Sequence, residues 1–138
     1  MPHDFQKLTP NLVVADVDRS VAFYRDVLGF TVATTVPEQP PYVFAMVQAG
    51  PTEVFLNALE PAAAEYPAFK DRAIGGTLTL FFEMTGVREA YAALKDRVNV
   101  VMPIETKWYG LTEFAFLDPD GYVITFAERD SVGGQRAD

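Results

Sequence analysis

The spacing of apolar residues changes along the first sixty residues from a strand-like to a helix-like pattern and back. Residues 7–15 are short, apolar and β-branched, which predicts a strand, and Pro10 within them indicates an edge position or a bulge. A helix is predicted next, because apolar side chains recur at helical spacing after a capping residue, Asp16 or Asp18, and Gly29 can end it in a left-handed conformation. Its apolar face comprises Val21, Tyr24, Val27 and Leu28. Three further strand-like runs follow, at 30–36, 42–48 and 52–59.

The second half of the chain returns to the same order. Residues 60–75 contain two prolines and a run of alanines, which indicates a connector with one short helix. Residues 76–83 then predict a strand, and a helical stripe follows at Val87, Ala90, Tyr91 and Leu94. Three strand-like runs complete the pattern, at 98–103, 112–117 and 122–127. Strand, helix and three strands therefore occur twice.

The two copies are offset by nearly constant distances. Thr9 to Thr77 is 77 − 9 = 68 residues, Val14 to Phe82 is 82 − 14 = 68, and Leu56 to Thr125 is 125 − 56 = 69. Two copies of about seventy residues are too few and too long for a solenoid, so each copy is interpreted as half of one domain. A helix on one face of a twisted sheet leaves the other face concave, and two such halves can form a cup that holds a ligand.

The expected architecture is therefore α+β, with two tandem βαβββ modules forming one cup-shaped sheet domain. The first module spans residues 7–59, the connector 60–75 and the second module 76–130. Together they give a single domain over 1–130, followed by a flexible tail at 131–138, which contains two glycines and no periodicity. Short edge strands in such a domain need to be covered, which favours a homodimer.

Composition and charge narrow the classes of function. Eleven basic and nineteen acidic residues give a net charge of −8, which argues against nucleic acid or an anionic membrane as the partner. The 138 residues include no cysteine and one histidine, His3, which excludes disulfides, thiolate metal sites, a cysteine nucleophile and an internal Ser-His-Asp triad. No apolar run is long enough to span a membrane and no signal pattern opens the chain, so we expect a soluble, cytoplasmic protein.

Two segments carry a family likeness. Residues 12–30, LVVADVDRSVAFYRDVLGF, and residues 108–128, WYGLTEFAFLDPDGYVITFAE, resemble the opening strand and helix and the closing hairpin of the vicinal oxygen chelate superfamily. This superfamily includes glyoxalase, the extradiol dioxygenases and the bleomycin-resistance proteins. The resemblance covers about residues 8–128 and implies the glyoxalase/bleomycin resistance fold.

The resemblance also implies where a metal ion would bind. Metal-dependent members hold it with His, Gln or Glu from the first and last strands of each half, and these places fall here on Thr9, Leu56, Thr77 and Thr125. None is a usual ligand, and a hydroxyl is not deprotonated at neutral pH, so we expect no metal and no other cofactor. A slip of one residue would turn a side chain to the other face, but the neighbours Glu53, Asn57 and Glu128 do not complete a ligand set.

Without a metal, the chain resembles the bleomycin-resistance type most, in which homodimers sequester a drug unchanged. We therefore expect a protein that sequesters a planar or amphipathic small molecule, such as an antibiotic, with an indole stacking on it. The expected contacts are Trp108, Tyr109, Tyr42, Phe44, Phe55, Phe114, Phe116 and Glu113. Glu113 would attract a cationic group, and the alternatives are that the strand phenylalanines are ordinary core and Glu113 a solvated charge.

Catalysis is the alternative function. The same superfamily contains lyases, isomerases and dioxygenases, and an enzyme of this fold could work with a metal or with a pocket carboxylate as proton acceptor. The strand carboxylates that could act in this way are Glu53, Glu83 and Glu113, and the sequence singles out none of them. We expect binding rather than turnover.

Overall fold

The structure is a computed structural model that describes residues 3–130. The chain divides into two compact units, Met1–Ile74 and Gly75–Asp138, which are described here one at a time. The flexible tail expected at 131–138 lies outside the described residues. Within the described part of the chain, no helix has the length and apolar character needed to cross a membrane.

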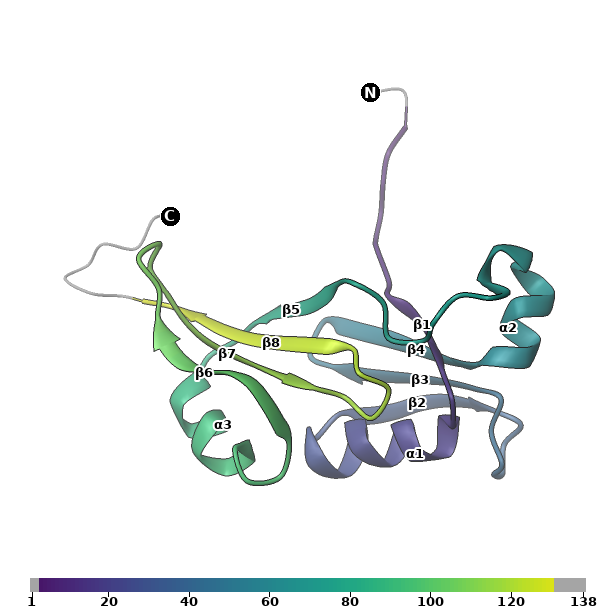
Figure 1. The fold of residues 1–138 in the computed structure, drawn as a ribbon, viewed down its shortest axis with the longest axis horizontal. Helices are drawn as coiled ribbons and strands as arrows, with labels where there is room; N and C mark the ends of the chain where they lie inside the picture. The colour runs from purple at the N-terminus through teal and green to yellow at the C-terminus, as the bar shows by residue number, and fades with distance from the viewer. Residues whose placement is uncertain (1–2, 131–138) are drawn as a thin grey trace. The chain divides into compact units, whose positions relative to one another are not determined.

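The first unit consists of a four-stranded sheet and its helices (Figure 1). Strand β1 (Asn11–Val14) leads into helix α1 (Val17–Ala22), which continues as a π-helical turn, η1 (Phe23–Val27). Strands β2 (Thr31–Val36), β3 (Phe44–Ala49) and β4 (Thr52–Ala58) follow. Helix α2 (Leu59–Glu65) and a short 3₁₀ helix, η2 (Pro67–Phe69), then occupy most of the expected connector. The sheet order is β1-β4-β3-β2, with β1 parallel to β4 and the other neighbours antiparallel.

The second unit repeats this order in its own sheet (Figure 1). Strand β5 (Thr79–Glu83) and helix α3 (Val87–Leu94) are followed by β6 (Asn99–Thr106), β7 (Leu111–Leu117) and β8 (Val123–Arg129). The sheet order is β5-β8-β7-β6, and β5 runs parallel to β8. The prediction of an α+β fold with two tandem βαβββ modules is confirmed.

The two sheets share one register between their first and last strands. Asn11 pairs with Phe55, so 55 − 11 = 44, and Thr79 pairs with Val123, so 123 − 79 = 44. The loops inside the units differ in length. Residues 37–43 join β2 to β3 and residues 50–51 join β3 to β4, whereas residues 107–110 join β6 to β7 and residues 118–122 join β7 to β8. The duplication therefore preserves the pairing of the outer strand although the loops have changed.

Each sheet buries one face beneath its own helices. In the first unit, Leu12, Val14 and Leu56 are almost completely buried, on the face that α1 contacts. In the second unit, Phe114 on β7 packs edge-on against Tyr91 of α3, with ring centroids 5.0 Å apart. We call the opposite face of each sheet its helix-free face. Because side chains alternate along a strand, the neighbours of the buried residues lie on this face.

The helix ends follow the sequence in the first unit and depart from it in the second. The Asp16 carboxylate accepts a hydrogen bond from the Arg19 backbone N–H at 3.1 Å, and Gly29, with φ +81°, ends the helix, as predicted. Gly86 at the start of α3 has no side chain to cap it. Instead, Glu128 of β8 accepts hydrogen bonds from the backbone N–H groups of Gly86 and Val87, at 3.1 and 3.0 Å. Glu128, considered above as a neighbour of the ion position, therefore caps a helix.

Candidate ligand-binding face

The helix-free face of the second sheet carries a row of four residues across its strands, three of which are acidic. Glu83 of β5 pairs with Ala127 of β8, Ala127 pairs with Glu113 of β7, and Glu113 pairs with Glu105 of β6. Residues paired in this way point to the same face. The adjacent row is made of Phe81, Thr125, Ala115 and Met102. An acidic row therefore lies beside a mostly apolar one.

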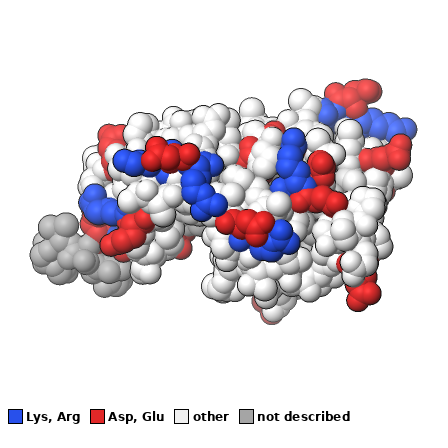
Figure 2. All heavy atoms as spheres, turned by 90° about the horizontal axis from the view of Figure 1, so that it is seen from below, with Lys and Arg blue, Asp and Glu red and all other residues white. Residues whose placement is uncertain are grey.

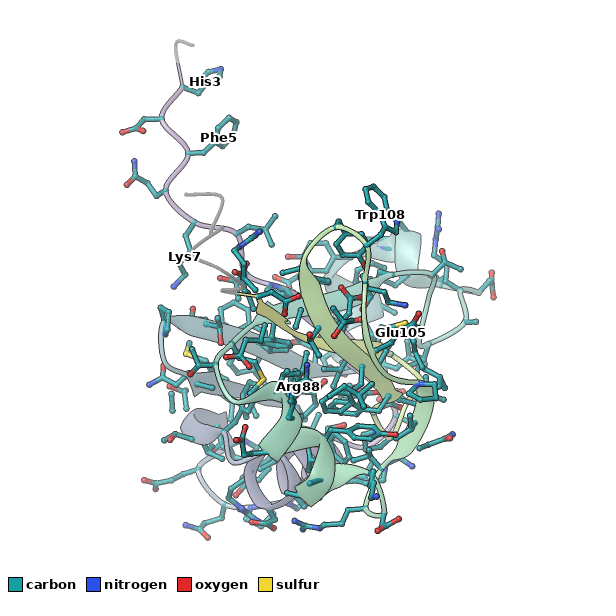
Figure 3. The ribbon with its side chains drawn as sticks, turned by 90° about the vertical axis from the view of Figure 1, so that its left-hand side faces the viewer. His3, Phe5, Lys7, Arg88, Glu105 and Trp108 are labelled. Carbon is teal, nitrogen blue, oxygen red and sulfur yellow. The ribbon has the colours of Figure 1, made fainter. Side chains whose placement is uncertain are left out.

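A tight loop between β6 and β7 places two aromatic rings at one end of this face. The Lys107 N–H donates to the Leu111 carbonyl at 2.7 Å, and the Gly110 carbonyl accepts from the Asp130 N–H at 2.8 Å. Gly110 has φ +92°, a conformation that favours glycine, so the chain can turn back there. Trp108, at the tip, is 95% exposed and points away from the strands (Figure 3). The loop thus presents the indole to solvent.

Tyr109 connects this loop to the acidic row. Its hydroxyl donates a hydrogen bond to Oε2 of Glu113 at 2.9 Å, and the Glu113 residue is only 5% exposed. The Trp108 and Tyr109 rings lie edge to face, with centroids 5.3 Å apart and an interplanar angle of 83°. An exposed indole, a half-exposed phenol and a buried carboxylate therefore form one connected group, which we call the Trp108–Tyr109–Glu113 group.

The environment of Tyr109 raises the pKa of its phenol above the ordinary value. The largest cause is the hydrogen bond to Glu113, which stabilises the protonated phenol, followed by burial and by the negative charges of Glu113 and Glu105. A phenolate at this place would face the Glu113 oxygen that now accepts its proton. The group is therefore most stable in the form with a neutral phenol.

We expect this raised pKa to make folding stability depend on alkaline pH. A group whose pKa is higher in the folded state stabilises the protein fully below its unfolded pKa, about 10 for tyrosine, and the contribution is lost as pH rises through the folded value. The urea midpoint of the wild type should therefore fall more steeply above about pH 10 than that of Tyr109→Phe. Tyr66→Phe is the control, since Tyr66 is equally exposed, at 45%, and packs on Phe69. Equal alkaline slopes for wild type and Tyr109→Phe would contradict the assignment.

The other carboxylates of the acidic row have cationic neighbours. The Lys107 ammonium lies 3.2 Å from Oε1 of Glu105, and the Arg129 guanidinium lies 3.4 Å from Oε2 of Glu83. Basic and acidic side chains are similarly interspersed over the surface seen in Figure 2. Glu113 differs from these two carboxylates, because its hydrogen bond comes from a neutral hydroxyl and its charge is shielded from water.

Three of the aromatic residues expected at the site lie in the first unit. Phe44 and Phe55 are partly buried on the helix-free face of the first sheet, where their rings meet at 5.4 Å and 61°. Tyr42 lies on the loop before β3, and its backbone N–H donates to the Asp18 carboxylate of α1 at 2.8 Å. These residues stand apart from the Trp108–Tyr109–Glu113 group in the sequence and belong to a different unit.

Phe114 and Phe116 lie on the covered face instead. Alternation predicts that the two share a face, and they stack at 5.7 Å, both with 0% exposure. Both also contact Phe126. They are core residues beneath α3, which corrects their assignment to the ligand contacts. The sequence could show that they point to the same side of the sheet but not which side the helix covers.

The four positions that the resemblance gives for a metal ion do not form a ligand set. Thr9 and Thr77 precede β1 and β5, and Leu56 is completely buried on the covered face of the first sheet. Thr125 alone lies on a helix-free face, where its hydroxyl is 2.7 Å from that of Thr79. Among residues 3–130, no three His, Asp or Glu side chains lie close enough together to hold an ion. Hydroxyls and an aliphatic side chain do not fit a divalent cation.

Residues 7–126 match the family described as the Glyoxalase/Bleomycin resistance protein/Dioxygenase superfamily. The chain belongs to this superfamily. A bleomycin resistance protein from Geobacillus stearothermophilus is 26% identical over 132 residues, which cover 87% of this chain and 94% of that protein. A protein of the same name from Staphylococcus aureus shows the same identity and coverage. Membership of the superfamily agrees with the duplicated βαβββ order seen in both units.

Solved structures show the same superfamily fold. A protein of unknown function from Agrobacterium tumefaciens superposes with a TM-score of 0.75 at 25% identity, over 91% of this chain and 95% of its own. TioX from Micromonospora gives a TM-score of 0.73 at 20% identity, over 91% and 99%. A glyoxalase/bleomycin resistance protein/dioxygenase from Nocardioides gives 0.76 at 20%, over 95% and 87%. These likenesses establish the fold alone.

Sequence reasoning did not find the link between Tyr109 and Glu113 or the facing of Glu105 and Glu113. A signal for both was present in the hairpin. In an antiparallel hairpin the paired residue numbers have a constant sum, and 105 + 113 = 106 + 112 = 218, so this hairpin is centred on residue 109. Had the turn been centred on Tyr109, with residues 107–111 between the paired positions 106 and 112, the facing of Glu105 and Glu113 would have followed.

Proposed function

We propose that this chain binds and sequesters a planar or amphipathic small molecule, without a catalytic metal, and that the Trp108–Tyr109–Glu113 group makes the decisive contacts. A planar ring of the ligand would stack on the Trp108 indole, and a cationic or hydrogen-bond-donating group would approach Glu113. An antibiotic of the bleomycin kind fits this description, and the 26% identical relatives are named as bleomycin resistance proteins.

The exposure of Trp108 is the observation that carries the proposal. An indole is among the largest apolar surfaces that a side chain offers, and here it is 95% exposed at the tip of a tight loop. It contributes almost nothing to the buried core of the second unit. Covering such an exposed apolar surface with a ligand or partner stabilises the complex. The neighbouring phenol and carboxylate would orient the ligand by hydrogen bonds.

The charge of the protein supports a ligand with a positive group. The net charge of −8 raises the local concentration of cations at the surface, and the acidic row supplies three carboxylates on one face of the second sheet. Glu105 and Glu83 already lie beside Lys107 and Arg129, so a ligand cation would approach Glu113, from the side of the half-exposed Tyr109 phenol because Glu113 itself is only 5% exposed. A phenol-bound carboxylate can accept a second hydrogen bond from such a group.

The test is a fluorescence titration of the wild-type protein. Trp108 is the single tryptophan, so its emission reports on this loop alone. We expect metal-free bleomycin to quench or shift the emission with a saturable dependence, and a neutral planar compound of similar size to do so more weakly. Calorimetry on the same samples gives the stoichiometry, and chromatography of the recovered ligand shows whether it is unchanged. An emission unaffected by either compound, with no heat of binding, would refute the proposal, and a chemically altered ligand would favour the enzymatic alternative.

We further propose that the binding form is a cytoplasmic homodimer. The support is the sheet topology, since β1 and β2 are the outer strands of the first sheet and β5 and β6 those of the second, and outer strands present unpaired backbone groups. Sedimentation equilibrium should then give twice the chain mass of 15.3 kDa, and fractionation of cells should recover the protein with the cytoplasm. A monomer at micromolar concentration would contradict the first statement, and secretion the second.

A further inference from the structure

The first strand of each sheet is attached on one side only. Strands β1 and β5 lie at the edge of their sheets, contain four and five residues, and pair in parallel with β4 and β8 respectively. A short parallel strand at an edge has few backbone hydrogen bonds to hold it. Any side-chain contact that links it to its neighbour therefore matters more than it would in the middle of a sheet.

Each of these parallel pairs carries one side-chain hydrogen bond on its helix-free face. In the first sheet the Asn57 amide nitrogen donates to the amide oxygen of Asn11. In the second sheet the hydroxyl oxygens of Thr79 and Thr125 lie 2.7 Å apart, and Thr125 is only 5% exposed. Asn11 and Thr79 are the first residues of their strands.

The two bonds occupy the same place in the register. Asn11 and Asn57 are separated by 57 − 11 = 46 residues, and Thr79 and Thr125 by 125 − 79 = 46, each two residues beyond the directly opposite partner. An amide pair in one copy and a hydroxyl pair in the other each link the first strand to the last strand by a side-chain hydrogen bond. The position of the bond, rather than the residue type, is what the two halves share.

The resemblance to the superfamily implies that its metal-dependent members bind an ion with residues of these same first and last strands. In this chain Thr125, one of those ion positions, is bonded to Thr79, and Asn57, which follows the ion position Leu56, is bonded to Asn11. Neither amides nor hydroxyls lose a proton at neutral pH, so they offer no negative charge to a divalent cation. These side chains therefore do not fit a transition-metal ion such as Zn²⁺, whereas they fit a direct hydrogen bond between the strands.

We propose that each pair is a cross-strand clasp, which holds the first strand against the last strand where relatives use an ion. The Asn11–Asn57 clasp secures β1, and the Thr79–Thr125 clasp secures β5. The edge strands are consequently held in register by the chain alone, with no dependence on a bound ion. This inference does not rest on the proposed ligand.

Hydrogen exchange of the wild-type protein and of Thr125→Val tests the second clasp. Valine keeps the shape of threonine and removes the hydroxyl, so the protected amides of β5 should exchange about threefold to tenfold faster. Thr106→Val is the matched control, since its hydroxyl lies 2.9 Å from that of Thr112 in the antiparallel pair β6–β7. This control should leave β5 unchanged. Unchanged β5 exchange in Thr125→Val, or equal acceleration in the control, would overturn the proposal.

A second variant and an ion titration keep the proposal testable if Thr125→Val folds poorly. Asn57→Leu should accelerate exchange in β1 and leave β5 as it is. Adding Zn²⁺, Ni²⁺ or Mn²⁺ to the wild type should change neither the exchange of β1 and β5 nor the melting temperature. Stoichiometric binding of any of these ions that protects β1 or β5, and that is lost in Asn57→Leu or Thr125→Val, would show that the positions hold an ion and would overturn the clasp.

Discussion

Replacing Phe114 by alanine is expected to destabilise the protein by about 3–5 kcal/mol, the usual cost of removing a fully buried aromatic ring from a core. Phe114 has 0% exposure and contacts three other rings, those of Tyr91, Phe116 and Phe126. The substitution removes the transfer free energy of the ring and leaves a cavity beneath α3 that these neighbours can only partly fill. Urea unfolding followed by far-ultraviolet circular dichroism measures the change.

Phe81→Ala provides the comparison for this measurement. Phe81 lies on the helix-free face of the same sheet and is 49% exposed, so its loss should cost about 1 kcal/mol. At a temperature where Phe114→Ala is folded, its affinity for bleomycin should equal that of the wild type. A small loss of stability together with a large loss of affinity would return Phe114 to the ligand contacts.

Replacing Trp108 by alanine should have the opposite pattern of effects. We expect the affinity for bleomycin, measured by calorimetry, to fall by about 30-fold, which corresponds to about 2 kcal/mol for a tryptophan at the centre of a contact. Stability should be unchanged within about 0.5 kcal/mol, since the side chain is 95% exposed in the free protein. The ring is thus expected to contribute to binding and not to folding.

The matched control for Trp108→Ala is Tyr66→Ala. Tyr66 is another exposed aromatic residue, at 45%, and it follows α2 in the first unit, whereas the proposed contacts belong to the second unit. Its loss should not change the affinity. If both substitutions weaken binding to the same degree, the ligand recognises exposed aromatic surface in general, and the Trp108–Tyr109–Glu113 group has no special role.

The elements of the fold were predictable because each has a strong local signal. Helix α3 spans Val87–Leu94, the same residues as the apolar stripe that predicted it, and α1 begins after Asp16 as the capping signal indicates. Strand β6 extends three residues beyond its prediction, to Thr106, because pairing with β7 and not apolar character determines where it ends. Local patterns thus located the elements, and tertiary pairing set their limits.

The metal-site positions show where such reasoning fails. An offset of 69 residues places Leu56 opposite Thr125 in the alignment, but 57 + 68 = 125, so it is Asn57 that shares the register position of Thr125. The offset is 68 residues in the first strands, since 79 − 11 = 68, and it is also 68 in the last strands, since 123 − 55 = 68, so an offset of 69 slips the alignment of the last strands by one residue. An error of one residue moves a side chain to the opposite face of a sheet.

The candidate site was less predictable than the fold, because it depends on tertiary packing and loop conformation. Whether a strand residue is buried or exposed depends on which face of the sheet the helix covers. Phe114 and Phe116 are buried because α3 covers their face. The direction of Trp108 depends on the conformation of a four-residue loop and on the positive φ of Gly110. Neither property follows from the spacing of apolar residues, although all three residues stood out in the sequence as aromatic.

The loop lengths of the two units have one more consequence. In the first unit the two connections contain seven residues (37–43) and two residues (50–51). In the second unit they contain four residues (107–110) and five residues (118–122), so each unit has nine residues in these two connections. The two connections thus have the same total length in both units, and the spacing of 44 residues between directly opposite residues of the first and last strands is also the same. A grafting experiment that exchanges both connections together should therefore preserve each sheet, whereas exchanging one alone would oblige the neighbouring strands to shift.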